Sequence, residues 1–180
     1  MARESIYDRY QYLRHMYTCL YETMTIAQTC FDPLFYYFPE DDNVYKNYEE
    51  QFIVGGAIKV APILTPGIAD SYPVYFPHGT WVNLADYSEI ITGPVTKNIT
   101  TKLTVNAHLR PGSLIPFQDN SQKQYSRTSQ LVEAPISIIA NRDEHGKASG
   151  TLLLDKGISR DEINGNHHEY YSISLQHKSL

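Results

Sequence analysis

The sequence predicts a mainly β fold with an α/β piece at its N-terminus. In the first part of the chain, apolar residues recur at steps of three and four, which is typical of one face of a helix. The run 31–38 that follows is apolar and aromatic without alternation, and such a run favours a strand buried on both faces. From about residue 57, short apolar runs separated by turn residues predict the strands of a β-sandwich.

The N-terminal helix is predicted over residues 4–28. Its apolar residues share one face, and they are Ile6, Tyr10, Leu13, Tyr17, Leu20, Met24 and Ala27. Together with the strand predicted over 31–38, this helix is the αβ half of an α/β unit, and a short helix is predicted over 48–54 before Gly55-Gly56. One such unit cannot close a barrel or cover both faces of a parallel sheet. Residues 1 to about 55 are therefore predicted to belong to a larger domain.

Beyond residue 56 the pattern changes to strands and turns. The clearest alternation runs over 99–109, where every second residue is apolar, which predicts one buried and one solvated face. The other predicted strands are 57–64, 74–76, 80–82, 113–117, 131–140, 151–154 and 171–175. The predicted connections are turns at Pro77-His78-Gly79, Pro111-Gly112 and 141–146, and a polar loop over 119–128.

Charge and composition exclude some classes of function. The chain has 15 Lys and Arg against 20 Asp and Glu, and its basic residues are spread out, which disfavours nucleic acid and an anionic membrane as partners. No stretch reaches the roughly 18 apolar residues that indicate a membrane span. Cys19 and Cys30 are the only cysteines, and we expect structural thiols, with a disulfide as the alternative.

Several segments, in the same order, resemble glycoside hydrolase family 31, the α-glucosidase group. Residues 9–20 resemble R-Y-x-L-L-P-x-L-Y-T-L-F, residues 32–35 resemble R-P-L-F, and Phe38-Pro39 resembles the F-P that follows it. Residues 51–55 resemble Q-F-x-x-G, residues 60–64 resemble V-A-P-V-L, and residues 75–81 resemble Y-x-P-x-G-x-W. Residues 109–116 resemble L-R-x-G-x-I-I-P, and residues 150–157 resemble G-x-L-x-x-D-D-G. Together the segments cover about residues 9 to 157.

The resemblance implies an architecture and a chemistry. It implies the last helix and strand of a (β/α)8 barrel over 1–55, a proximal β-sandwich domain over 56–145 and the start of a distal β-domain over 146–180. Members of the family are retaining glycosidases with two catalytic Asp residues, both upstream of the matched segment. Retaining hydrolysis needs two carboxyl groups roughly 5 to 5.5 Å apart. Since no residue here matches either Asp, we expect this chain to buttress the barrel of a parent enzyme and to be inactive alone, with no cofactor and no metal.

The parent enzyme would act on an α-glucoside or oligosaccharide, and the upstream barrel segment would be the chain's main partner. A free-standing, non-catalytic β-sandwich that binds carbohydrate or protein is the alternative. The sequence departs from the family pattern at three positions. Asp32 replaces the Arg of R-P-L-F, Arg14 replaces the helix Pro, and Lys156 replaces the second Asp of D-D-G. The reversed charge at Asp32 leaves open whether the parent is active.

Four groups of residues are candidates for a site. Asp41 and Asp42 follow the predicted barrel strand and are the predicted substrate-binding pair, with a solvated acidic turn as the alternative. Trp81 could stack on a sugar ring, but a core residue is favoured. The run 167–169, His-His-Glu, is interpreted as surface rather than a metal site. Asn98-Ile99-Thr100 matches the N-glycosylation sequence, which would place the parent in the secretory pathway.

Overall fold

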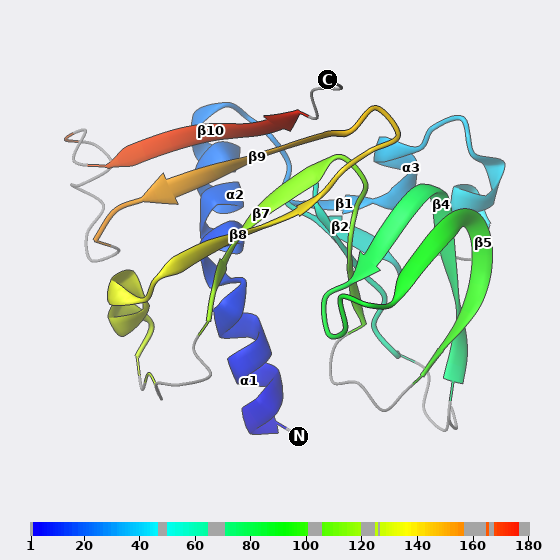
Figure 1. The fold of residues 1–180 in the computed structure, drawn as a ribbon, viewed down its shortest axis with the longest axis horizontal. Helices are drawn as coiled ribbons and strands as arrows, with labels where there is room; N and C mark the ends of the chain where they lie inside the picture. Colours follow the sequence, from blue (N-terminus) through cyan, green and yellow to red (C-terminus); the bar gives the residue numbers. More distant parts are fainter. Residues whose placement is uncertain are drawn as a thin grey trace.

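The computed structural model describes residues 2–46, 50–64, 71–100, 106–119, 125, 127–156, 165 and 168–176. They form two β-sheets side by side, with the N-terminal helices packed on one of them (Figure 1). The six-stranded sheet has the order β1-β2-β3-β6-β4-β5, and the four-stranded sheet has the order β10-β9-β7-β8. The predicted mainly β fold is confirmed. Within the described residues, no helix combines the length and the apolar character needed to cross a membrane.

The elements have the following bounds. The six-stranded sheet contains β1 (Phe31–Pro33), β2 (Phe52–Val54), β3 (Ile58–Val60), β4 (Ser71–Asn83), β5 (Ile90–Thr100) and β6 (Ala107–Leu109). The four-stranded sheet contains β7 (Ser113–Gln118), β8 (Ile136–Asn141), β9 (Lys147–Leu154) and β10 (Glu169–Gln176). The helices are α1 (Ala2–Gln11), α2 (Leu13–Thr25), α3 (Leu34–Tyr37) and the 3-10 helices η1 (Asp42–Tyr45) and η2 (Thr128–Glu133).

The predicted N-terminal helix is two helices. The helix breaks at Tyr12, whose φ of −105° and ψ of 8° are not helical, and α2 ends at Thr25 rather than at residue 28. α2 packs against β9 and β7 of the four-stranded sheet. A disulfide joins Cys19 of α2 to Cys30, the residue before β1. The expectation of structural thiols is therefore wrong, and the disulfide that we kept as the alternative is present.

The predicted buried strand over 31–38 is wrong in length and in kind. β1 has three residues, pairs antiparallel with β2, and gives way to α3 at Leu34. Only alternate side chains are buried there, so Asp32 points inward while Phe31 is 59% exposed. Pro33 explains the early end, because it has no N–H for a further ladder bond. The predicted helix over 48–54 is also wrong at 52–54, which is β2, and 47–49 lie outside the described residues.

The predicted turn at Pro77-His78-Gly79 is a bulge within a continuous strand. β4 pairs with β5 on both sides of a register shift between Phe76 and Gly79. Gly79 has a φ of +111°, a conformation that residues with a Cβ rarely adopt. The chain therefore bends at this point without reversing.

Other predicted strands are confirmed over most of their length. β7, β9 and β10 lie where strands were predicted, and Pro111-Gly112 is a turn. The strand predicted over 131–140 begins at Ile136, because η2 occupies residues 128–133. The run 99–109 contributes the end of β5 and β6, while 101–105 and most of the loop 119–128 lie outside the described residues. β2 and β3 pair across Gly55-Gly56, and the division into three domains stays a prediction.

A row of polar side chains crosses the buried face of the six-stranded sheet. Directly paired positions on neighbouring strands place the polar residues Asp32, Lys59, His108 and Asn83 on one face together with Ile53, and all five are buried. Among the described residues, Lys59 Nζ and both ring nitrogens of His108 have no hydrogen-bond partner. Lys59 Nζ lies 4.3 Å from the centre of the Phe76 ring. Burial holds the pKa of Lys59 well below its ordinary value, and burial, with Lys59 nearby, lowers the pKa of His108 to about 4.

We predict that Lys59→Met stabilises the chain and flattens the pH dependence of its unfolding. Because the pKa of Lys59 is lower in the folded state, the unfolded chain binds the extra proton, and stability rises with pH up to the unfolded pKa of about 10.4. One such proton gives a slope of up to about 1.4 kcal/mol per pH unit. Urea unfolding between pH 7 and 9, followed by the fluorescence of Trp81, measures this slope in the wild type and in the variant. A slope in the variant as steep as in the wild type would contradict the prediction.

Candidate functional site

The α2 helix buries four polar side chains, while two large apolar side chains in its C-terminal half are exposed. Arg14, His15, Thr18 and Glu22 are buried against the sheets. On the opposite side of the helix Leu20 is 50% exposed and Met24 61%, and Ile26, just past the helix end, is 64% exposed. We call Leu20, Met24 and Ile26 the outward face. A surface helix of a soluble protein normally has the reverse arrangement, with its apolar stripe on the core.

The inward polar contacts are specific and reach both sheets. His15 Nε2 donates to the carbonyl oxygen of Val54 in β2 at 3.1 Å, and burial lowers the pKa of His15, which keeps the ring neutral. The Thr18 hydroxyl accepts from the Leu153 N–H of β9 at 3.0 Å. Tyr170 of β10 donates to Glu22 at 2.7 Å, and burial, with the bond to Glu22, raises the pKa of Tyr170 to about 12. These contacts fix the rotation of α2 about its axis.

The close approach of α2 to the six-stranded sheet depends on a glycine. Gly55 has a φ of +55°, and a Cβ added there would lie 2.6 Å from His15 Nε2. A side chain at this position would therefore strain the backbone and displace the His15 ring. The glycine of the Q-F-x-x-G pattern therefore allows α2 to pack closely against the six-stranded sheet.

A second exposed group is aromatic and lies on the elements that follow. Phe35 of α3 stacks on Tyr45 of η1, with ring centres 5.5 Å apart, and both rings are also exposed to solvent. Tyr36, next to Phe35, is 61% exposed. Exposed apolar and aromatic groups of this size mark surfaces that contact another molecule or another part of the same one.

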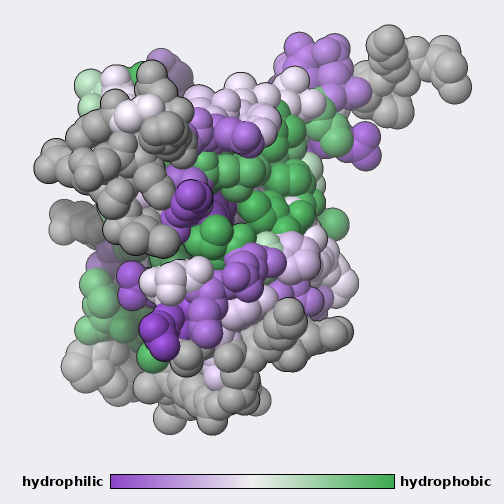
Figure 2. All heavy atoms as spheres, turned by 90° about the vertical axis from the view of Figure 1, so that its left-hand side faces the viewer, coloured by the Kyte–Doolittle hydropathy of each residue, from purple (hydrophilic) through white to green (hydrophobic). Residues whose placement is uncertain are grey.

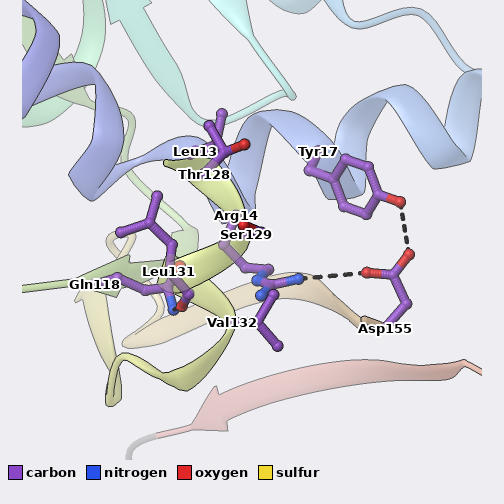
Figure 3. Close-up of a pocket in the computed structure, with 9 residues that line it drawn as sticks. All are labelled: Leu13, Arg14, Tyr17, Gln118, Thr128, Ser129, Leu131, Val132 and Asp155. Carbon is purple, nitrogen blue, oxygen red and sulfur yellow. Dashed lines mark hydrogen bonds and ion pairs between the residues drawn. The ribbon is translucent and has the colours of Figure 1, made fainter. Parts of the chain in front are cut away.

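A pocket lies where α2, the end of β9 and η2 meet. The cavity of about 220 Å³ is lined by Leu13, Arg14, Tyr17, Gln118, Thr128, Ser129, Leu131, Val132 and Asp155 (Figure 3). These elements meet on the left-hand side of Figure 1, the side that faces the viewer in Figure 2. There hydrophobic residues gather in the middle and hydrophilic residues border them.

Two charged residues meet at this pocket. Arg14 Nη1 lies 3.6 Å from Asp155 Oδ1, and the Tyr17 hydroxyl donates to Asp155 Oδ2 at 2.6 Å. Both charged side chains are nearly inaccessible to solvent. Arg14 stands where the family pattern has the helix Pro, and its charge is therefore paired with the opposite charge of Asp155. Burial lowers the pKa of Arg14, and the charge of Asp155 opposes that shift.

The other two departures from the family pattern also have a place in the fold. Asp32 is 3% exposed and accepts a hydrogen bond of 2.7 Å from the Tyr37 hydroxyl. Burial and this bond raise the pKa of Tyr37, whose ring also lies under the Arg110 guanidinium. The reversed charge is thus hydrogen-bonded within the fold. Lys156 is exposed.

Asp41 and Asp42 have different surroundings. Asp41 caps η1: its carboxylate accepts from the Asn43 N–H at 3.0 Å and from the Tyr75 hydroxyl at 2.5 Å. Asp42 is exposed on η1. Asp41 and Asp42 lie between Phe35 and Tyr45 in the sequence. A sugar-binding role for the pair stays a prediction.

Trp81 and His168, two further candidates from the sequence, make contacts within the fold. Trp81 is completely buried and donates to the Pro77 carbonyl oxygen at 2.8 Å, which confirms the core interpretation. His168 lies 2.8 Å from the Tyr21 hydroxyl, and His167 is outside the described residues. In the described part of the chain, no cluster of His, Cys, Asp or Glu could hold a metal ion.

Comparisons with known proteins agree with these features. The model of the glycosyl hydrolase family 31 C-terminal domain matches residues 27–115. The α-glucosidase of Hordeum vulgare is 33% identical over 161 residues, which cover 88% of this chain and 18% of that protein. The intestinal sucrase-isomaltase of Rattus norvegicus is 30% identical over 183 residues, 99% of this chain and 10% of that protein. The chain therefore spans less than a fifth of the length of these relatives.

Solved structures share the fold. The GH31 dextranase of Flavobacterium johnsoniae, complexed with glucose, has a TM-score of 0.77 and 24% identity over 97% of this chain and 21% of its own. The glucosidase II alpha subunit has a TM-score of 0.80 and 18% identity over 94% of this chain and 18% of its own. The chain thus belongs to glycoside hydrolase family 31 and corresponds to a C-terminal portion of its members.

Proposed function

We propose that this chain supports the catalytic barrel of a longer, retaining α-glucosidase-like enzyme and contributes neither of its catalytic carboxylates. The observation that carries the proposal is the orientation of α2, which is held by polar contacts to both sheets while its apolar side faces outward. A helix with polar contacts on one side and an apolar surface on the other fits between two layers of protein. The upstream barrel is the second layer.

The chemistry of the family supports a non-catalytic role. A retaining glycosidase needs a nucleophile and an acid/base whose carboxyl groups flank the scissile bond, roughly 5 to 5.5 Å apart. In this chain Glu22 is bonded to Tyr170, Asp32 to Tyr37 and Asp155 to Tyr17, which gives each of these buried carboxylates a structural partner. The substrate of the parent, an α-glucoside or oligosaccharide, is therefore bound chiefly by the barrel.

The isolated chain should not hydrolyse a chromogenic α-glucoside, because both catalytic carboxylates of the family lie outside the matched segment. The measurement is release of the chromophore against a heat-treated control. Turnover above that control would mean that a carboxylate pair within this chain is catalytic.

Asp42 is the one residue of this chain that we propose to contact substrate, as the exposed member of the acidic pair, while Asp41 holds η1 in place. In the longer enzyme, Asp42→Asn should raise KM several-fold and leave kcat unchanged, because a binding contact made equally in both states affects KM alone. Steady-state kinetics measures both constants. An unchanged KM would mean that Asp41 and Asp42 form an ordinary acidic turn with no role in substrate binding.

The isolated chain should self-associate through the outward face, since exposed Leu20, Met24 and Ile26 have no covering layer in the described chain. The double variant Leu20→Gln, Met24→Gln should weaken association at least tenfold, about 1.4 kcal/mol, by sedimentation velocity. Ile90→Gln is the matched control, because Ile90 is 57% exposed on β5, and it should leave association unchanged. A monomeric wild type at all concentrations would favour the free-standing binding module instead.

A further inference from the structure

We propose that Asn98 is a site of N-linked glycosylation. Asn98-Ile99-Thr100 is the only place in the 180 residues where Asn stands two residues before Ser or Thr with no Pro between. A match to so short a sequence is weak evidence alone, because it also occurs by chance. Two independent features of the structure give it weight: the placement of the three residues and the oxidation state of the cysteines.

The fold presents the acceptor side chain to solvent. The three residues lie near the C-terminal end of β5, the outermost strand of the six-stranded sheet as described. β5 runs along the right-hand side of Figure 1. Ile99 is 3% exposed and packs in the core, while Asn98 and Thr100 on either side are exposed. Alternation along the strand therefore turns both residues that a glycosyltransferase must recognise to the same outer face.

The surroundings of Asn98 leave room for a carbohydrate. Asn98 pairs with Pro73 and Thr100 pairs with Ser71, and both of these small partners on β4 are themselves exposed. β5 and β1 are the two opposite edges of the sheet, and β1 is the strand next to the disulfide of α2. A glycan on β5 is thus compatible with a barrel packed on the outward face.

The cysteines point to the compartment in which this modification occurs. Cys19 and Cys30 are joined, and the described residues contain no free cysteine. Disulfides of this kind persist in secretory and extracellular compartments and are rare in the cytosol. Folding in an oxidising compartment and transfer of an oligosaccharide to Asn98 are two consequences of the same route through the cell.

The donor in this transfer is a lipid-linked oligosaccharide. The Asn98 side-chain nitrogen forms a bond to C1 of an oligosaccharide carried on a polyisoprenyl diphosphate. The bond from C1 to the phosphate oxygen breaks, the amide loses one proton, and the polyisoprenyl diphosphate leaves.

The experiment expresses the full 180-residue chain behind a cleavable secretion leader in eukaryotic cells. The wild type should carry one glycan that peptide N-glycosidase F removes, with conversion of Asn98 to Asp marked by ¹⁸O from labelled water in peptide mass spectrometry. Asn98→Gln and Thr100→Val should each abolish the modification. Thr100→Ser is the matched control and should retain it, because it keeps the hydroxyl that the sequence requires.

Glycan occupancy is measured in cell lysate and in medium, so that a variant retained through misfolding is still scored. A wild-type chain with unmodified Asn98 in both fractions would overturn the proposal. Occupancy that survives Asn98→Gln or Thr100→Val would also overturn it. Neither result depends on contact with a barrel, so the proposed supporting function stands or falls separately.

Discussion

The polar contacts of α2 with both sheets are the constraint on which the rest of the structure depends. Three side chains of this helix, His15, Thr18 and Glu22, bond to β2, β9 and β10. β2 belongs to the six-stranded sheet and the other two strands belong to the four-stranded sheet. The helix therefore connects the two sheets, and the disulfide from Cys19 links it covalently to Cys30, the residue before β1. Because these bonds fix which side of α2 faces inward, they also dictate that Leu20 and Met24 face outward.

The free energies of hydrogen bonding and of apolar burial show why α2 lacks stabilisation when no second layer covers it. A hydrogen bond inside a protein adds a net of only about 0.5 to 1.5 kcal/mol, whereas burying a Leu or Met side chain contributes roughly 1.5 to 3 kcal/mol. A helix that buries polar groups and exposes apolar ones forgoes the larger contribution. The same helix gains it as soon as a second layer covers the outward face. The Arg14 and Asp155 pair fits this view, since a buried ion pair gives specific geometry more than net stability.

Periodicity was enough to predict the general fold and one side of the site. The steps of three and four placed Leu20 and Met24 on one helical face, and the alternation in β10 predicted its strand. Local features decided what periodicity missed. Pro33 ends β1 early, and the left-handed φ of Gly79 permits a bulge where a turn was predicted.

The buried charges were beyond sequence-based prediction. Lys59 lies between Ile58 and Val60 in a short strand, and alternation alone would place such a lysine on a wet face. It is buried because the sheet has protein on both of its faces at that point. Likewise the pairing of Arg14 with Asp155 joins residues on α2 and just beyond β9, and no local pattern links them. Such contacts depend on tertiary packing.

The oxidation rate of Met24 is the most direct test of the central claim. Met24 lies on the outward face and is 61% exposed, while Met16 on the same helix is partly buried and is an internal reference. Both methionines can be followed by peptide mass spectrometry during mild peroxide treatment of this chain and of the longer enzyme. We expect Met24 to oxidise much faster than Met16 in the chain and to be protected in the longer enzyme. Equally fast oxidation of Met24 in both would show that the barrel does not cover α2, and would contradict the account.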